Sequence, residues 1–198
     1  MGGPPVESAS PLPNSVVALA RGGALLAPKP ASRVARRDIA VFTVSVALWS
    51  LREMGAVDFS VSNPVRWLPF SSLMVGLRST LVTDDSIERD LLNQVRMILS
   101  GNRYRSDHRV NVRELVREWI IDSTALWPTV GDPYDEVLEL GMRQSRNAYL
   151  DPERLDSAAL RLASGWLVFL HDEPELATRL NSTVSRGIYS AVDRSASE

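Results

Sequence analysis

Thr83–Gly101, TDDSIERDLLNQVRMILSG, carries the sharpest helix signals in this chain of 198 residues. Thr83 is suited to cap a helix N-terminus, and the acids Asp84, Asp85 and Glu88 match the positive end of the helix dipole. Apolar residues then recur about once a turn, at Ile87, Leu91, Val95 and Ile98. Because Gly101 suits a helix C-terminus, we expect one amphipathic helix over this stretch.

Similar start signals recur downstream. Asn111 is a good cap for a helix that runs toward Pro128. An aspartate precedes a first-turn proline at Asp132-Pro133 and again at Asp151-Pro152, and both pairs predict a helix start. A last helix is expected from near Pro174, with an apolar stripe at Leu176, Leu180, Val184 and Ile188.

Upstream, the apolar run Ile39–Met54, IAVFTVSVALWSLREM, predicts one buried helix, although its β-branched first half, 39–48, also suits a strand. Ala56–Val61 alternates between apolar and polar residues, as a short strand with one wet face does. The order helix, glycine, short strand also occurs in winged-helix proteins, whose recognition helix enters the major groove of DNA. Such a helix presents polar and basic side chains, whereas this run is apolar on nearly every face, so we interpret it as a core helix. The sequence therefore predicts a mostly α, single helical bundle-like domain of five to six helices with one short β element.

The first 37 residues differ from the rest of the chain. They hold half of the 12 prolines, and their one acid is Glu7. We expect a flexible, basic arm at 1–37, an α-helical domain at 38–193 and a short tail at 194–198. With Arg33, Arg36 and Arg37, the arm suits a phosphate backbone or an acidic partner surface; an organelle-targeting peptide is a second interpretation.

Composition excludes several kinds of site. The chain has no cysteine and two histidines, so thiolate metal sites, disulfides and histidine-rich metal sites are not expected. We predict no cofactor, because no phosphate-binding glycine loop or nucleophile motif occurs. The longest apolar run is too short to span a bilayer and no secretory signal is evident, so we expect an intracellular, cytoplasmic protein without a transmembrane segment.

The string Asp84-Asp85-Ser86-Ile87-Glu88 is the strongest enzyme-like feature. Carboxylates one helical turn apart converge and could hold Mg²⁺ against a diphosphate. The string resembles the aspartate-rich motif of terpene synthases, and the resemblance implies a metal site at Asp84, Asp85 and Glu88. The helix dipole is the alternative reason for acids at this place.

An arginine-rich stretch separates the helix of Thr83–Gly101 from the next one. It contains one tyrosine and one histidine, and its candidate anion-binding residues are Arg96, Arg103, Tyr104, Arg105, His108, Arg109 and Arg113. Arginine forks with an interleaved tyrosine suit phosphate together with base stacking. A solvated loop of salt bridges is the alternative interpretation.

These observations favour a non-catalytic helical protein that works by association, as a self-assembling structural subunit or as an interaction partner of another protein. The first alternative is a phosphate-reading module that binds RNA, DNA or an anionic lipid headgroup through the arginine-rich loop. The second is a Mg²⁺-dependent enzyme that uses the aspartate-rich helix start. No set of catalytic residues is predicted.

Overall fold

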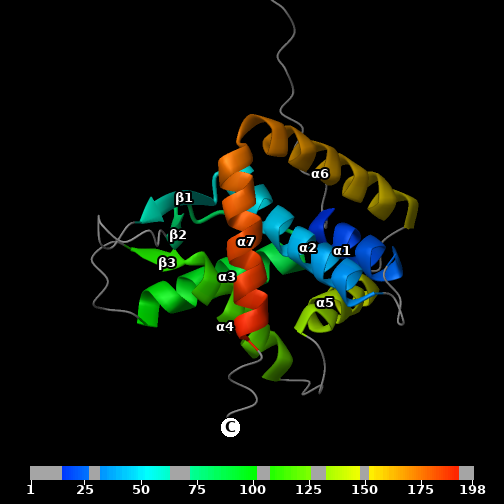
Figure 1. Ribbon diagram of the computed structural model, residues 1–198, viewed down its shortest axis with the longest axis horizontal. Coiled ribbons are helices and arrows are strands. Elements are labelled where there is room, and N and C mark those ends of the chain that lie inside the picture. The colour runs from blue at the N-terminus through cyan, green and yellow to red at the C-terminus, as the bar shows by residue number, and fades with distance from the viewer. Residues whose placement is uncertain are drawn as a thin grey trace, which may run out of the picture.

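The structure, a computed structural model, describes residues 15–26, 32–62, 72–101, 108–125, 133–147 and 152–191. These residues form seven helices and one three-stranded sheet (Figure 1). The helices are α1 (Ser15–Leu26), α2 (Arg33–Glu53), α3 (Ser86–Gly101), α4 (Val112–Ala125), α5 (Pro133–Asn147), α6 (Pro152–Asp172) and α7 (Pro174–Ser190). The strands are β1 (Val57–Ser62), β2 (Ser72–Leu77) and β3 (Arg109–Asn111). The expected mostly helical fold is confirmed.

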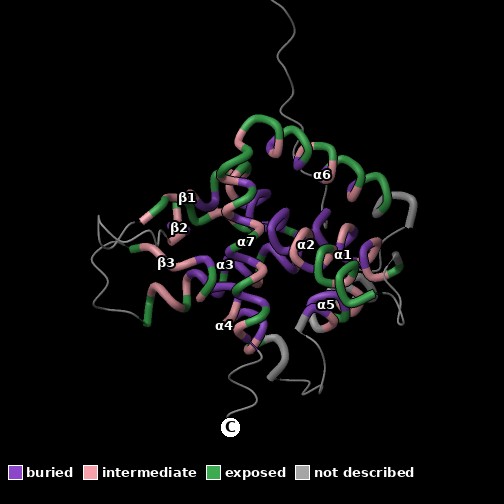
Figure 2. Tube along the Cα trace, in the orientation of Figure 1, coloured by how far each residue is buried: buried purple, intermediate pink, exposed green. Residues whose placement is uncertain are grey.

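Helix α2 is the centre of the fold (Figure 2). Every residue from Thr43 to Leu51 is buried, because α1, α3, α5, α6, α7 and β1 all contact this helix. A helix that is apolar on all sides must be covered on all sides. The run 39–48 is therefore a helix and not a strand, and the Thr43 hydroxyl donates to the Ile39 carbonyl 2.9 Å away within it.

The sheet is larger than the single short strand that the sequence predicts. The chain turns at Gly55, whose φ is 71°, and β1 then pairs antiparallel with β2, which pairs antiparallel with β3. One row across the sheet joins Asp58, Gly76 and Arg109. Strand β2 lies in a segment for which the sequence predicts no strand, and β3 is too short to show an alternating pattern. Long-range pairing creates both strands.

Two helices begin before residue 37, the predicted boundary of the N-terminal arm. Val16, Val17 and Ala20 of α1 are fully buried in the main core, and α1 contacts α2, α5 and α6. Helix α2 begins at Arg33, with the Ser32 hydroxyl accepting from the Ala35 amide at 3.2 Å. The folded unit therefore includes residues 15–26 and 32–37. Residues 1–14 and the tail at 194–198 lie outside the described residues.

An aromatic cluster fixes α6 on α2. The Trp49 ring meets Trp166 edge-on with centroids 5.8 Å apart and stacks on Phe169 at 5.9 Å. Gly165 makes room for this contact, since a Cβ there would lie 2.7 Å from the Trp49 ring. Arg52 closes the end of the cluster: it lies over the Phe169 ring and donates to both carboxylate oxygens of Glu173, at 2.8 and 3.1 Å. These contacts determine which side of α6 faces the core.

The contact between α4 and α7 predicts the effect of a single methyl group. A Cβ at Gly187 would lie 2.8 Å from Val116 Cβ and 3.0 Å from the Arg113 carbonyl oxygen. We expect Gly187→Ala to lower the free energy of unfolding by about 1–2 kcal/mol, because overpacking outweighs the better helix propensity of alanine. Urea denaturation measures the change.

Gly22 of α1 is the matched control, since a Cβ there meets nothing within 4 Å. We expect Gly22→Ala to leave stability unchanged or to raise it by up to about 1 kcal/mol. A Gly187→Ala protein at least as stable as the Gly22→Ala protein would contradict the close packing of α4 on α7.

Candidate functional site

The acidic string at the start of α3 joins two helices. Asp85 is the N-cap of α3: its Oδ1 accepts from the amides of Ile87 and Glu88 at 2.9 and 3.1 Å. Its Oδ2 accepts from the amides of Val16 and Val17, in the first turn of α1, at 2.8 and 2.9 Å. One carboxylate thus satisfies the free N–H groups of two helix starts that are far apart in the sequence. The predicted cap at Thr83 is corrected to Asp85.

Glu88 lies buried beside this cap. The Thr83 hydroxyl donates to Glu88 Oε2 at 2.6 Å and also accepts from the Asp85 amide at 3.2 Å. Burial, and then the nearby charge of Asp85, raise the pKa of Glu88 to about 7, against hydrogen bonds from Ser50 and Thr83 that lower it. Burial likewise raises the pKa of Asp85, against its four backbone hydrogen bonds. Both side chains are therefore buried in a part of the structure that solvent does not reach.

The three acids of the string do not form a common metal site. Asp84 is exposed, whereas Asp85 and Glu88 are each only 3% exposed. Both oxygens of Asp85 are already occupied by amides. Among the residues that the structure describes, no group of three or more His, Asp or Glu side chains could hold a metal ion. The resemblance to the terpene synthase motif therefore gains no support, and Asp85 serves as a structural joint between α1 and α3.

Arg109, from the arginine-rich stretch, lies on the sheet. Its guanidinium donates to Asp58 Oδ2 at 2.9 Å and to the Ser60 hydroxyl at 2.7 Å, across the whole width of β2. Gly76 lies between the two partners, and a Cβ there would come within 2.7 Å of Asp58 Oδ1. Arg78 approaches the same carboxylate oxygen at 3.4 Å. A glycine in the middle strand thus leaves room for an ion pair between the two outer strands.

The other described candidates from the arginine-rich stretch have different surroundings. Arg96 donates to the Leu81 carbonyl at 3.0 Å and to the Asn93 side chain at 3.2 Å. Arg113 is exposed at the start of α4, where the Asn111 side chain caps the helix as predicted, accepting from the Arg113 amide at 2.9 Å. His108 is exposed with a φ of 45°. The remaining candidates, Arg103, Tyr104 and Arg105, lie outside the described residues.

The arginines assigned to the arm belong to the first turns of α2. Arg36 Nε lies 2.6 Å from Asp135 Oδ1 of α5, an ion pair without hydrogen-bond alignment between those two atoms. Arg37 pairs with its neighbour Asp38 at 3.0 Å, and Arg33 is exposed. Arg36 and Arg37 therefore each meet a carboxylate within the chain, and Arg36 helps to hold α5 against α2.

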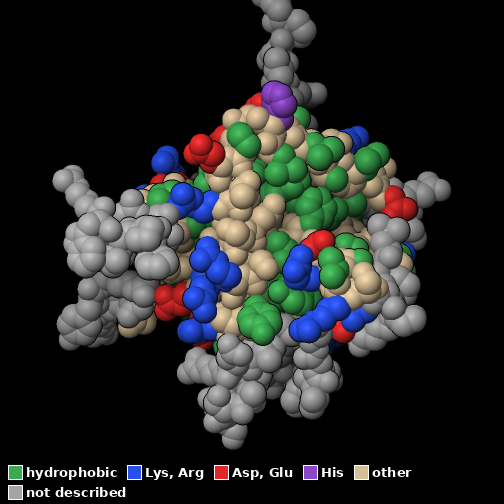
Figure 3. Space-filling view, in the orientation of Figure 1, with side chains coloured by type: hydrophobic (Ala, Val, Ile, Leu, Met, Phe, Trp, Pro, Cys, Tyr) green, Lys and Arg blue, Asp and Glu red, His purple; other side chains and the backbone are tan. Residues whose placement is uncertain are grey.

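Sequence reasoning missed the outer face of α6. Leu160, Leu167 and Val168 are 70%, 64% and 59% exposed, although the opposite face of the helix is held in the core. Figure 3 shows apolar side chains gathered over α6 and beside it. The signal was present in the sequence: these three residues lie off the stripe of Leu162, Trp166 and Phe169 that faces the core. Exposed apolar side chains gathered on one face indicate an interaction surface.

Comparison with known proteins gives no further guide, because no protein-family model, curated protein or solved structure matches the chain. Within the described ranges, no helix combines the length and the apolar character that crossing a membrane requires.

Proposed function

We propose that this protein is a non-catalytic helical protein that self-associates through the outer face of α6. The observation that carries the proposal is the exposure of Leu160, Leu167 and Val168 on a helix whose other face is fixed by the aromatic cluster. Burying a leucine contributes about 2 kcal/mol, so covering three such side chains on each of two chains is a substantial driving force. Exposed apolar area of this kind also favours association over a monomer.

A second copy of the chain fits this face because its pattern is self-complementary. Exposed positions along α6 alternate between large and small side chains, with Ser157, Leu160, Ser164 and Leu167 about one turn apart. When two copies of α6 lie antiparallel, Leu167 of one packs over Ser164 of the other, and the reverse contact follows by symmetry. Arg161 of each copy then lies within a turn of Asp172 of the other, so the charges are complementary as well.

Light scattering coupled to size-exclusion chromatography tests the association. We expect the wild type at micromolar concentration to have about twice the 21.9 kDa mass of the chain. Leu160→Asp combined with Leu167→Asp should weaken the dimer by at least about 100-fold, since two buried apolar contacts per chain are replaced by charges. Both side chains are exposed within one chain, so the variant should keep its helical circular dichroism.

Val82→Asp is the matched control, because Val82 is 78% exposed and lies outside α6. It should leave the dimer intact. A wild type that is monomeric at 100 µM, or a dimer that survives both leucine substitutions, would overturn the proposal.

Charge reversal tests whether the partner is a second copy. Arg161→Asp and Asp172→Arg should each weaken the dimer by about two- to fivefold, as expected for exposed ion pairs. The two changes in one chain should restore it. If the double variant is weaker than either single variant, the antiparallel pairing is wrong.

A further inference from the structure

A second surface, separate from α6, gathers arginines that are distant in the sequence. Pairing of β2 with β3 sets Gly76 beside Arg109 and leaves Arg78 two residues further along. Strand β3 runs directly into α4, which places Arg113 in the first turn of α4, four residues after Arg109. Gly187 of α7 packs against the Arg113 carbonyl, so Arg186 lies next to this point. We name the surface formed by Arg78, Arg109, Arg113 and Arg186 the arginine face.

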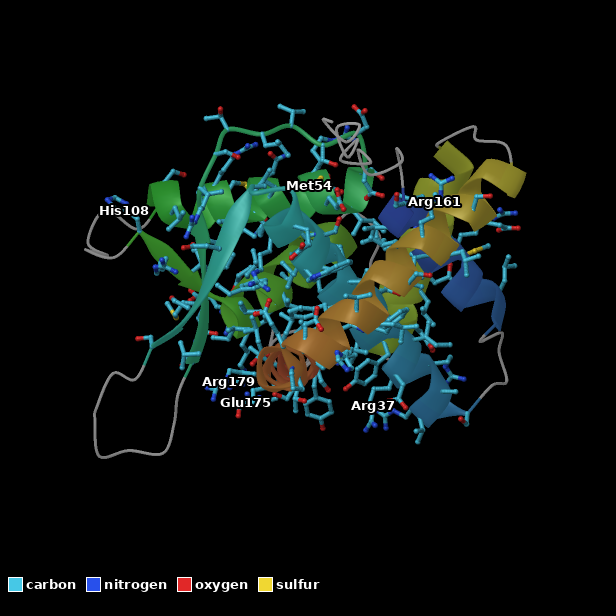
Figure 4. All side chains as sticks on the ribbon, turned by 90° about the horizontal axis from the view of Figure 1, so that it is seen from above. Arg37, Met54, His108, Arg161, Glu175 and Arg179 are labelled. Atoms are coloured by element: carbon cyan, nitrogen blue, oxygen red, sulfur yellow. The ribbon has the colours of Figure 1, made fainter. Side chains whose placement is uncertain are left out.

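Figure 3 shows basic side chains along the flank of α7 that is nearer the sheet. In the perpendicular view of Figure 4, Arg179 projects from α7 on that flank, while Arg37 lies on the other side of the helix. Glu175 is the acid labelled beside Arg179. Basic side chains therefore also lie along this flank of α7.

The arginine face carries more positive charge than its neighbours neutralise. Arg78 and Arg109 share one carboxylate, that of Asp58. Arg113 and Arg186 have no carboxylate partner among the described residues; Arg186 donates instead to the Ser182 carbonyl at 3.2 Å and to the Thr183 hydroxyl at 3.4 Å. The contacts of Arg186 hold its guanidinium group in place without neutralising it, and a face with this excess of positive charge suits a chain of phosphates.

The exposed side chain of Tyr189 favours a nucleic acid over a simple phosphate as the ligand. Tyr189 is exposed on α7, three residues after Arg186, and so lies about one turn along the same helix. A simple phosphate needs guanidinium groups alone, whereas an exposed ring beside them adds a stacking surface for an unpaired base. We propose that the arginine face binds single-stranded nucleic acid, with Arg113 and Arg186 on phosphates and Tyr189 against a base.

Fluorescence anisotropy of the full chain with a labelled 12-nucleotide oligouridine tests the proposal. We expect binding at 50 mM salt that weakens by about 20-fold at 200 mM salt, as about three neutralised phosphates of a single strand predict. Arg113→Ala combined with Arg186→Ala should reduce the affinity at least about 10-fold, and Tyr189→Ala about 5- to 10-fold.

Arg21→Ala combined with Arg89→Ala is the control of equal charge, because the two arginines lie on other helices, α1 and α3, and neither belongs to the face. This variant should bind as the wild type does. An equal loss in the two double variants would show attraction to net charge alone and would overturn the site. Binding to vesicles of phosphatidylserine together with no binding to the oligonucleotide would overturn the choice of ligand in favour of a membrane surface.

Discussion

Asp85→Ala is expected to lower the free energy of unfolding by about 3 kcal/mol, because it removes the N-caps of two helices at once. The substitution leaves four amides without their acceptor, those of Val16, Val17, Ile87 and Glu88. Loss of the charge beside Glu88 returns part of this free energy, since the charge of Asp85 disfavours ionised Glu88. Urea or thermal denaturation followed by circular dichroism measures the net change.

The adjacent residue provides a control of the same chemistry. Asp84 is exposed, so Asp84→Ala should change stability by less than about 0.5 kcal/mol. Hydrogen exchange gives a second measurement: in Asp85→Ala the amides of Val16 and Val17 should exchange faster than in the wild type, because the joint between α1 and α3 is lost. Equal stability of the Asp84→Ala and Asp85→Ala proteins would show that this joint does not hold α1.

Stability is expected to fall as the pH rises from about 5 to 8. The pKa of Glu88 is about 7 in the folded protein and near 4.5 when the chain is unfolded. Between these values the folded state holds a proton that the unfolded state releases, so raising the pH favours unfolding. The difference in pKa corresponds to a loss of about 3 kcal/mol. Asp85 and Asp90, whose pKa values are raised mainly by burial, act in the same direction.

Glu88→Gln isolates the contribution of this one carboxyl group. The glutamine amide oxygen can still accept from the Thr83 hydroxyl, but it carries no charge to desolvate. We expect the variant to be more stable than the wild type at pH 8, by up to about 3 kcal/mol, and to match it more closely at pH 5. Denaturation curves at a series of pH values measure both.

Glu175→Gln serves as the control, because Glu175 is exposed in the first turn of α7. It should follow the pH profile of the wild type. A wild-type stability that is constant from pH 5 to pH 8 would contradict the burial of an ionisable Glu88, as would a Glu88→Gln profile parallel to that of the wild type.

Local signals in the sequence were enough to predict most helices. α5 and α6 begin at Pro133 and Pro152, as the aspartate–proline pairs indicate, and α7 begins at Pro174. These predictions succeed because a cap and a first-turn proline act within a few residues of the helix that they start. The boundary of α1 could not be found in this way, since its first turn is capped by Asp85, 68 and 69 residues away.

The candidate sites show the same division. The arginine-rich stretch could be identified from composition, but in the structure Arg109 pairs with Asp58, which lies 51 residues away in the sequence. This ion pair passes over Gly76, and only the register of the strands places that glycine between the two side chains. The aspartate-rich string could be identified as well, but its structural role depends on the start of α1. The sequence alone does not distinguish Leu160 and Leu167 from the other apolar residues of α6. They stand out only in the structure, where the opposite face of the helix packs in the core and leaves these two side chains exposed.

The amino-acid sequence by itself determined a mostly helical protein, the starting points of its later helices and the absence of cysteine chemistry, because each follows from residue type or from neighbours within one turn. Only the tertiary structure decided which charges are buried, which arginines are neutralised and which apolar face is left outside. Those outcomes depend on contacts between residues far apart in the chain, and burial in such contacts is what changes the energy of a charge or of an apolar side chain.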